Sequence, residues 1–514
     1  MSRSNINNLQ SCFSPVLWMF RAPSVRMMAS QSPPRLPPLS LPEALSPQSD
    51  SNSSSTGTPH PGSTPGVGEL VITSPSSINQ ALNSPEGITC FGNERLFLLE
   101  QAKLCNNKKL SDVTLVVGGI KYYAHKIVLV MASEVFESML TGEWSDSGKK
   151  ELELIEEPIC VGVFSRFLQF LYGCSIRLNM ENSLPIFVLA DKYDVKDLQV
   201  VCTNFACTYI IPKLQLKDVF HVWFQYATKC MHRILVLACI KAMAEKMDEI
   251  IGSLDWEQEW TGLDKYQLIE FLDSSDLKVK DEFDLWKGTV KWLTHPGNTE
   301  RVDNLEKNLR DVLPYIRFPM LTAEQIYEVE NCKLAQNFPS LLQKYLMSAY
   351  KYHALPLSMR ACVREFNGAS FLLRNYSDLR WDCRFKVQNY SQCSKGEEKG
   401  IRFSTRASSY PSQTWDWELK IYPKGISSTS DDFKVVLYSN LILDQPRPME
   451  YLLSLVSKDE VIHSVCGKKN FSKTRYMIDT ELDKKVSLAD LAQSDSPLLV
   501  DDCLILQITL KPAE

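Results

Sequence analysis

Apolar residues recur at every second position in short stretches between residues 110 and 155, which predicts a small sheet. Val113, Leu115 and Val117 share one face of a strand, and Gly118-Gly119 can supply the positive φ values of a two-residue hairpin turn into a second strand at 120–124. A third, edge-like strand is expected at 151–154, where leucine alternates with glutamate.

Helical spacing surrounds these strands. A helix with a partly apolar face is expected before the sheet, around Leu96, Leu99 and Leu104. Residues 126–132 form an apolar helical run, and Ser133 is a good N-cap for a helix that follows. Further helices are predicted by Phe136, Met139 and Leu140, and by Val163, Phe164, Phe167, Leu168 and Leu171. We expect these helices to pack on the small sheet, giving an α/β domain.

The pattern changes twice further along the chain. Residues 210–355 show apolar periodicity in segments of 10 to 20 residues without convincing strand alternation, which predicts an all-α domain. Short alternating runs follow from about residue 375, which favours an antiparallel β-sandwich. The expected strands lie at 384–387, 401–405, 415–422, 433–438, 451–456 and 504–510.

The N-terminal segment differs from all of these. Residues 1–88 are rich in Ser, Pro and Asn and poor in apolar residues after Phe20, so they cannot bury enough surface to offset their ordering entropy. We expect a disordered tail. The predicted fold class is therefore multidomain α+β, with the tail at 1–88, the α/β domain at 89–209, the helical domain at 210–355, a linker at 356–374 and the sandwich at 375–514.

Ordered motifs give these domains family resemblances. The motifs S-D-V, A-H-K, F-L-Q-F-L-Y and L-A-D-K-Y, at 111–113, 124–126, 167–172 and 189–193, resemble a BTB/POZ domain. The runs L-I-E-F-L-D-S-S-D-L-K-V at 268–279 and V-L-P-Y-I-R-F-P-M-L-T-A-E-Q-I at 312–326 resemble a BACK domain. The run W-E-L-K-I-Y-P-K-G at 417–425 and the closing run at 496–510 resemble the TRAF-like (MATH-like) family.

The BTB resemblance implies a homodimer formed through the first helix and adjacent strands, and binding to cullin-3. Trp144 and Asp146 stand where the family's cullin-contacting hydrophobic-x-Glu element lies, although Asp replaces the commoner Glu; alternatively, Trp144 packs on its own domain. Asp112 and Lys126 match the family's charged pair near the dimer groove, or are simply a solvated strand start and helix start. His125 is expected to be a core or capping residue.

Within the other two domains, the resemblances leave the interaction residues open. Val219, Trp223 and Tyr226 share one helical stripe that could extend a cullin-binding face, but an aromatic stripe is more often core. A MATH-type sandwich can bind an extended peptide. Trp415 and Trp417 are expected to face the core.

Composition excludes several other functions. The net charge of −5 gives no basic footprint for nucleic acid. Fifteen cysteines without a C-x-x-C pair indicate reduced thiols, and the seven histidines show no metal-ligand spacing, so we expect no metal and no cofactor. No stretch is as long as a membrane span, and no catalytic motif is present.

These observations predict a non-catalytic adaptor in the cytoplasm. The leading hypothesis is a substrate receptor of a cullin-3 RING ubiquitin ligase that recruits an unknown protein client through the sandwich. One alternative is a ligase-independent oligomeric scaffold. Another is a secreted BTB-BACK adhesion or scavenger-type protein, because N-x-S patterns occur at Asn375, Asn389 and Asn470. The acid-free, arginine-containing first 42 residues also leave a mitochondrial address open.

Overall fold

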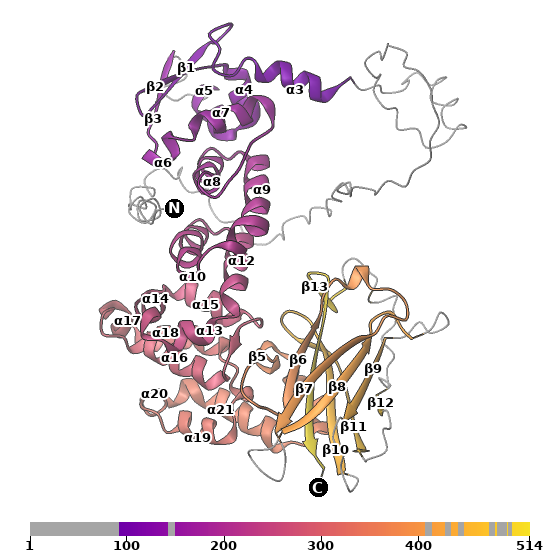
Figure 1. The fold of residues 1–514 in the computed structure, drawn as a ribbon. Helices are drawn as coiled ribbons and strands as arrows, with labels where there is room; N and C mark the ends of the chain where they lie inside the picture. Colours follow the sequence, from indigo (N-terminus) through magenta and orange to yellow (C-terminus); the bar gives the residue numbers. More distant parts are fainter. Residues whose placement is uncertain are drawn as a thin grey trace, which may run out of the picture. The chain divides into compact units, whose positions relative to one another are not determined.

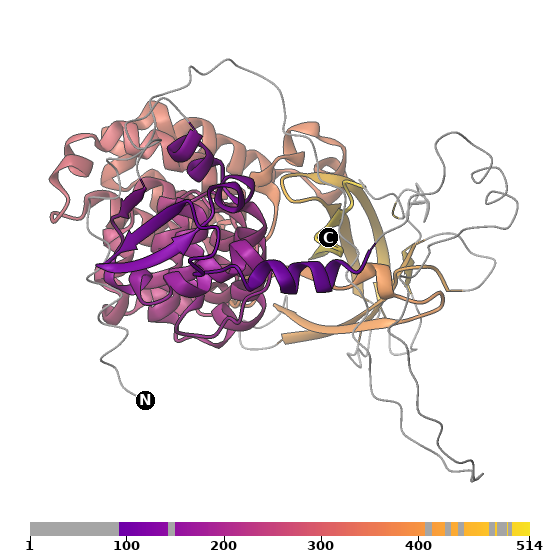
Figure 2. The same cartoon turned by 90° about the horizontal axis from the view of Figure 1, so that it is seen from above.

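A computed structural model describes residues 92–141, 150–406, 414–426, 433–439, 447–471, 478–480, 491 and 496–513. The expected N-terminal tail at 1–88 lies outside these ranges. The chain divides into two compact units, Met1–Ala206 and Cys207–Glu514, which are described separately (Figures 1 and 2).

A three-stranded sheet forms the centre of unit 1, as the alternating pattern predicts. Strands β1 (Val113–Val117) and β2 (Ile120–Ala124) form an antiparallel hairpin, and β3 (Glu151–Leu154) pairs with β1 in parallel, giving the order β2-β1-β3. Gly118 and Gly119 turn the hairpin with φ of +54° and +81°. A Cβ on Gly118 would approach Val161 to 2.7 Å, so glycine is required there for space as well as conformation.

The other elements described in unit 1 are helices. They are α3 (Glu94–Ala102), α4 (Lys126–Ala132), α5 (Glu134–Thr141), α6 (Pro158–Val161), α7 (Phe164–Gly173), α8 (Ser183–Lys192) and α9 (Lys196–Phe205). Ser133 acts as the expected N-cap, because its hydroxyl accepts the backbone N–H of Phe136 at 3.0 Å. Phe136 stacks on Tyr193 with ring centroids 4.6 Å apart, in a core that also contains Phe164 and Phe167.

The first part of unit 2 is helical. Its α-helices are α10 (Leu216–Asp218), α11 (Gln225–Lys229), α12 (Arg233–Ala244), α13 (Met247–Gly252), α14 (Glu257–Gly262), α15 (Lys265–Asp273), α16 (Glu282–Thr294), α17 (Thr299–Asp303), α18 (Leu305–Val312), α19 (Ala323–Glu330), α20 (Lys333–Asn337), α21 (Pro339–Ala354) and α22 (Leu357–Cys362), and the π-helical turn η4 (Val219–Phe224) joins α10 to α11. Local sequence sets several starts: Asp264 with Gln267, and Thr322 with Gln325, form capping boxes. The two-residue strand β4 (Lys278–Val279) interrupts the helices.

The segment expected to be a linker is structured. After α22 it forms the short 3₁₀ helices η8 (Arg364–Asn367) and η9 (Ala369–Phe371). Leu357, Phe366, Phe371 and Arg374 are buried. This segment leads into strand β5 (Asn375–Tyr376), which pairs with β4 in parallel.

The C-terminal part is an antiparallel sandwich, as predicted. One sheet runs β11-β10-β14-β13 with β6 also paired to β14, and the other runs β12-β9-β8-β7. The strands are β6 (Asp382–Val387), β7 (Lys399–Arg406), β8 (Thr414–Tyr422), β9 (Lys434–Ser439), β10 (Arg447–Val456), β11 (Val461–Phe471), β12 (Ile478–Thr480), β13 (Leu499–Val500) and β14 (Cys503–Pro512). The pattern predicts six of these positions and misses β11, β12 and β13. Trp415 and Trp417 face the core, as expected, and the Trp417 indole donates to the Thr405 hydroxyl at 2.9 Å.

Candidate protein-interaction surfaces

Helix α3 presents apolar side chains to solvent at the start of unit 1. Leu96, Phe97 and Leu99 are 57%, 70% and 54% exposed, and the helix buries none of its residues fully. The opposite side lies against α7, where Ala102 fills the space beside Gly173. A helix with apolar residues on the side away from its own core suits contact with another protein.

A second apolar strip is on α4. Ile127 and Met131 are one helical turn apart and are 69% and 80% exposed. The exposure of these two residues is not predicted by the sequence, because residues 126–132 are almost entirely apolar and such a run does not show which side of the helix is buried. The exposure of Phe97 is not predicted either.

The charged pair expected near the dimer groove has a structural role. The side chain of Asp112 is exposed, and its Oδ1 accepts the backbone N–H of Lys126 at 2.8 Å, at the start of α4. Asp112 therefore holds the start of the helix against β1. His125, just before the helix, is buried: its ring contacts the Tyr172 hydroxyl at 2.8 Å and the carbonyl of Lys109 at 2.9 Å. Burial raises the pKa of Tyr172 to about 12, so its hydroxyl stays protonated at neutral pH.

The expected cullin-contacting residues lie outside the described residues. Trp144 and Asp146 belong to the segment between the end of α5 at Thr141 and the start of β3 at Glu151. Their assignment continues to rest on the sequence.

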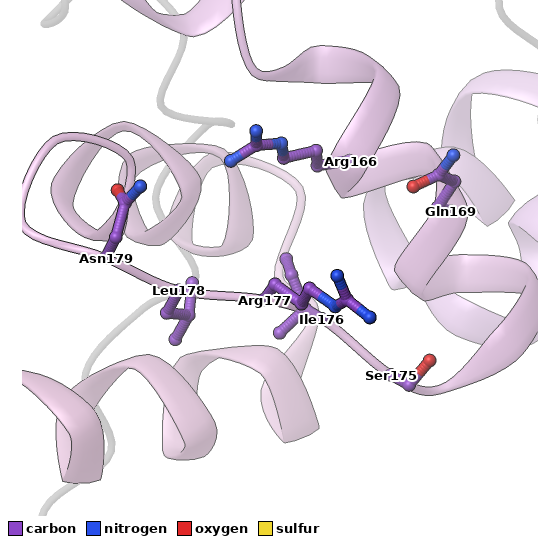
Figure 3. A pocket seen from close by; sticks show the side chains of 7 residues that line it. All are labelled: Arg166, Gln169, Ser175, Ile176, Arg177, Leu178 and Asn179. Carbon is purple, nitrogen blue, oxygen red and sulfur yellow. The ribbon is translucent and has the colours of Figure 1, made fainter.

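A hollow of about 530 Å³ lies beside α7. Arg166 and Gln169 project from α7, and the segment that follows the helix supplies the rest of the lining (Figure 3): Ser175, Ile176, Arg177, Leu178 and Asn179. The Oδ1 of Asn179 accepts the backbone N–H groups of Glu181 and Asn182, which leaves its Nδ2 as a donor. Two guanidinium groups and no carboxylate line the hollow, a composition that suits an anionic group.

The aromatic stripe of the helical domain is core. Val219, Trp223 and Tyr226 are all buried, which agrees with the structural interpretation of their spacing rather than an interface.

The described residues also bear on metal binding, membrane spanning and glycosylation. Within the described ranges, thirteen cysteines are free thiols, and no group of three or more His, Cys, Asp or Glu side chains is placed to hold a metal ion. Across the same ranges, no helix has the length and apolar character needed to cross a bilayer. Of the glycan acceptor patterns, Asn375 is half-buried and its amide donates to the Asp276 carbonyl at 2.9 Å, so a glycan there would have to displace this contact. Asn389 and Asn470 are exposed.

Three family descriptions match the chain in the order of its domains. The BTB/POZ domain matches residues 102–210, the BACK domain ("BTB And C-terminal Kelch") matches 220–331, and the BTBD17 TRAF domain matches 371–438.

Similar proteins include BTB/POZ domain-containing protein 17 and Kelch-like proteins. BTB/POZ domain-containing protein 17 of Xenopus laevis is 24% identical over 447 residues, which cover 80% of this chain and 88% of the relative. The Homo sapiens protein of that name is 26% identical over 330 residues, covering 62% and 63%. Kelch-like protein 3 of Danio rerio is 24% identical over 268 residues, which cover 52% of this chain and 42% of the relative.

Proposed function

On the premise that the chain is a BTB-BACK protein with a C-terminal TRAF-type domain, similar to BTB/POZ domain-containing protein 17, we propose that it is a non-catalytic substrate receptor of a cullin-3 RING ubiquitin ligase. The single observation that carries this proposal is the unbroken order of BTB, BACK and TRAF-type parts, each of which is an interaction module. The cytoplasm is the compartment we propose for this work.

The BTB domain forms the homodimer. The exposed side of α3 supports this step, because three large apolar side chains on one short helix gain free energy when a second copy covers them. Asp112 and Lys126 are joined by a hydrogen bond where β1 and α4 begin, and in this proposal they border the dimer groove.

Cullin-3 binds the same domain at a separate place. Trp144 is the apolar anchor and Asp146 accepts hydrogen bonds, in the segment between α5 and β3. The BACK domain sets the distance to the sandwich, which recruits the client protein. Two client sites in one dimer raise the effective concentration of the ligase at its client.

Binding of the purified full-length protein to the N-terminal region of cullin-3 tests the proposal. Isothermal titration calorimetry should give one cullin per protomer, and Trp144→Ala should weaken the affinity about tenfold to a hundredfold, as loss of an aromatic anchor does. Tyr266→Ala is the matched control, because Tyr266 is an exposed aromatic residue on α15 of the helical domain. A dimeric protein that gives no heat with cullin-3 would instead be the ligase-independent scaffold.

A further inference from the structure

One buried carboxylate lies where the helical part of unit 2 meets the segment leading into the sandwich. Glu282, in the first turn of α16, has a fully buried side chain. Its oxygens accept four hydrogen bonds: from Arg374 Nε at 3.0 Å, Arg374 Nη2 at 3.3 Å, the backbone N–H of Arg317 at 2.8 Å and the Tyr376 hydroxyl at 2.7 Å. Partners from both sides of the junction therefore converge on one group.

Two buried arginines extend these contacts. Arg374 also donates to the carbonyls of Ser274 at 2.6 Å and Tyr315 at 2.9 Å. Arg317, in the helical domain, donates to the carbonyl of Leu372, in the segment before the sandwich, at 2.9 Å. The segment before the sandwich is thus bonded to the helical domain through charged groups that are shielded from water.

Polar contacts around this centre join the same two parts. Asp276, after α15, pairs with Arg384 at 2.9 Å and with Lys386 at 3.2 Å, and both cations belong to strand β6 of the sandwich. Arg380 donates to the carbonyl of Met320 at 2.9 Å. The pairing of β4 with β5 adds backbone bonds next to Glu282.

On the sandwich side, Gln507 of β14 holds the incoming segment. Its Oε1 accepts the backbone N–H of Leu373 at 3.0 Å, and its Nε2 donates to the carbonyl of Phe371 at 3.1 Å. Leu372 joins a small apolar cluster with Ile505, on the side of β14 that faces away from the sandwich core, together with Val456 and Val461. This part of the sheet's outer face is therefore covered by the chain itself.

We propose that the contacts centred on Glu282, together with the Gln507 amide, lock the helical domain and the sandwich into one cooperative unit. Partial separation would leave a carboxylate and guanidinium groups unpaired before water reaches them, which is costly because such a charge has neither its ion-pair partner nor its hydration. The sandwich is accordingly a fixed extension of the helical domain rather than a swinging arm. Given the proposed function, the lock holds the client at a constant position relative to the BACK domain.

Hydrogen exchange of the full-length protein in increasing urea, read by mass spectrometry, tests the lock without cullin or client, so its outcome is independent of the ligase assignment. In the wild type, slowly exchanging amides of α16 and of β14 should open together, at the same urea concentration and with the same dependence on urea. Sandwich amides that open well before those of α16, or well after, would refute the proposal.

Two variants weaken the lock at different points. Glu282→Gln removes the central charge, and Gln507→Leu keeps the side-chain volume but removes both amide hydrogen bonds. In each variant the amides of α16 and of β14 should open at different urea concentrations. Hydrogen exchange in β5 and β6 should also be faster than in the wild type, by about a hundredfold for Glu282→Gln and by about tenfold for Gln507→Leu. Glu306→Gln is the control, because Glu306 forms an exposed pair with Arg310 on α18, and it should exchange as the wild type does. If Glu282→Gln does not fold, Gln507→Leu still decides, and coincident openings in that variant would count against the lock.

Discussion

Phe97→Asp should convert the proposed dimer into a monomer. Phe97 is 70% exposed on α3, and burying a whole phenylalanine side chain is worth about 1.5–3 kcal/mol, so covering the exposed part gives about 1–2 kcal/mol per protomer. Both copies contribute in a symmetric dimer, which makes the loss about 2–4 kcal/mol. The dimer dissociation constant should therefore rise between roughly thirtyfold and a thousandfold, and further because the new carboxylate would have to be desolvated.

Sedimentation equilibrium measures this constant directly. The monomer should remain folded, because α3 buries none of its residues fully, and its free energy of unfolding in urea should change by less than about 0.5 kcal/mol. Leu254→Asp is the matched control, since Leu254 is 83% exposed but lies in unit 2. An unchanged dissociation constant in Phe97→Asp would show that α3 does not form the dimer contact.

Three further predictions concern the stability of unit 2. Gly467→Ala should lower the free energy of unfolding by about 1–3 kcal/mol, since the added Cβ would lie 2.3 Å from the hydroxyl of the buried Tyr451; a urea titration showing no loss would contradict this. Arg301→Lys should cost about 2–4 kcal/mol in the same assay, because Arg301 donates to three buried carbonyls and stacks 3.8 Å from the Trp292 ring centroid; a change below about 0.5 kcal/mol would contradict it. Burial alone raises the pKa of Glu282, but its arginine partners outweigh burial and hold the pKa below its ordinary value. Its charge therefore stabilises the fold above about pH 4.3, and this stabilisation is lost as pH falls through the lower folded-state pKa. The stability difference between wild type and Glu282→Gln should shrink over that acid range, and a difference independent of pH would contradict the assignment.

Local patterns account for the parts of the fold that the sequence predicts. The hairpin of β1 and β2 follows from alternation and two adjacent glycines, and the start of α5 follows from the hydroxyl of Ser133. The exposed character of Asp112 also follows from its position before a strand. Each of these features depends on residues close together in the chain, so a short window of sequence contains its cause.

The features that escaped prediction depend on distant partners. Strand β11 contains His463, Ser464 and Gly467, which weaken an alternating pattern, yet it forms a long ladder with β10, in which Tyr451 lies opposite the glycine. Glu282 and Arg374 are far apart in the sequence, and glutamate and arginine side chains are ordinarily exposed to solvent. Only the fold shows that they are buried against one another.

In the proposed receptor, self-association and cullin binding use different parts of unit 1, and this separation discriminates between the receptor and the scaffold. We assign only self-association to the exposed apolar side of α3, so a dimer is compatible with both functions. A receptor needs both properties, because one cullin contact per protomer attaches the ligase and dimerisation doubles the client sites. We therefore expect the Phe97→Asp monomer of a receptor to bind cullin-3 with the affinity of the wild-type protomer while losing avidity for a client with two binding segments. Trp144→Ala should give the converse result, an intact dimer that keeps its avidity for the client and loses cullin. If Phe97→Asp also abolished cullin binding, the two surfaces would not be independent. The assignment of Trp144 as an independent anchor would then fail.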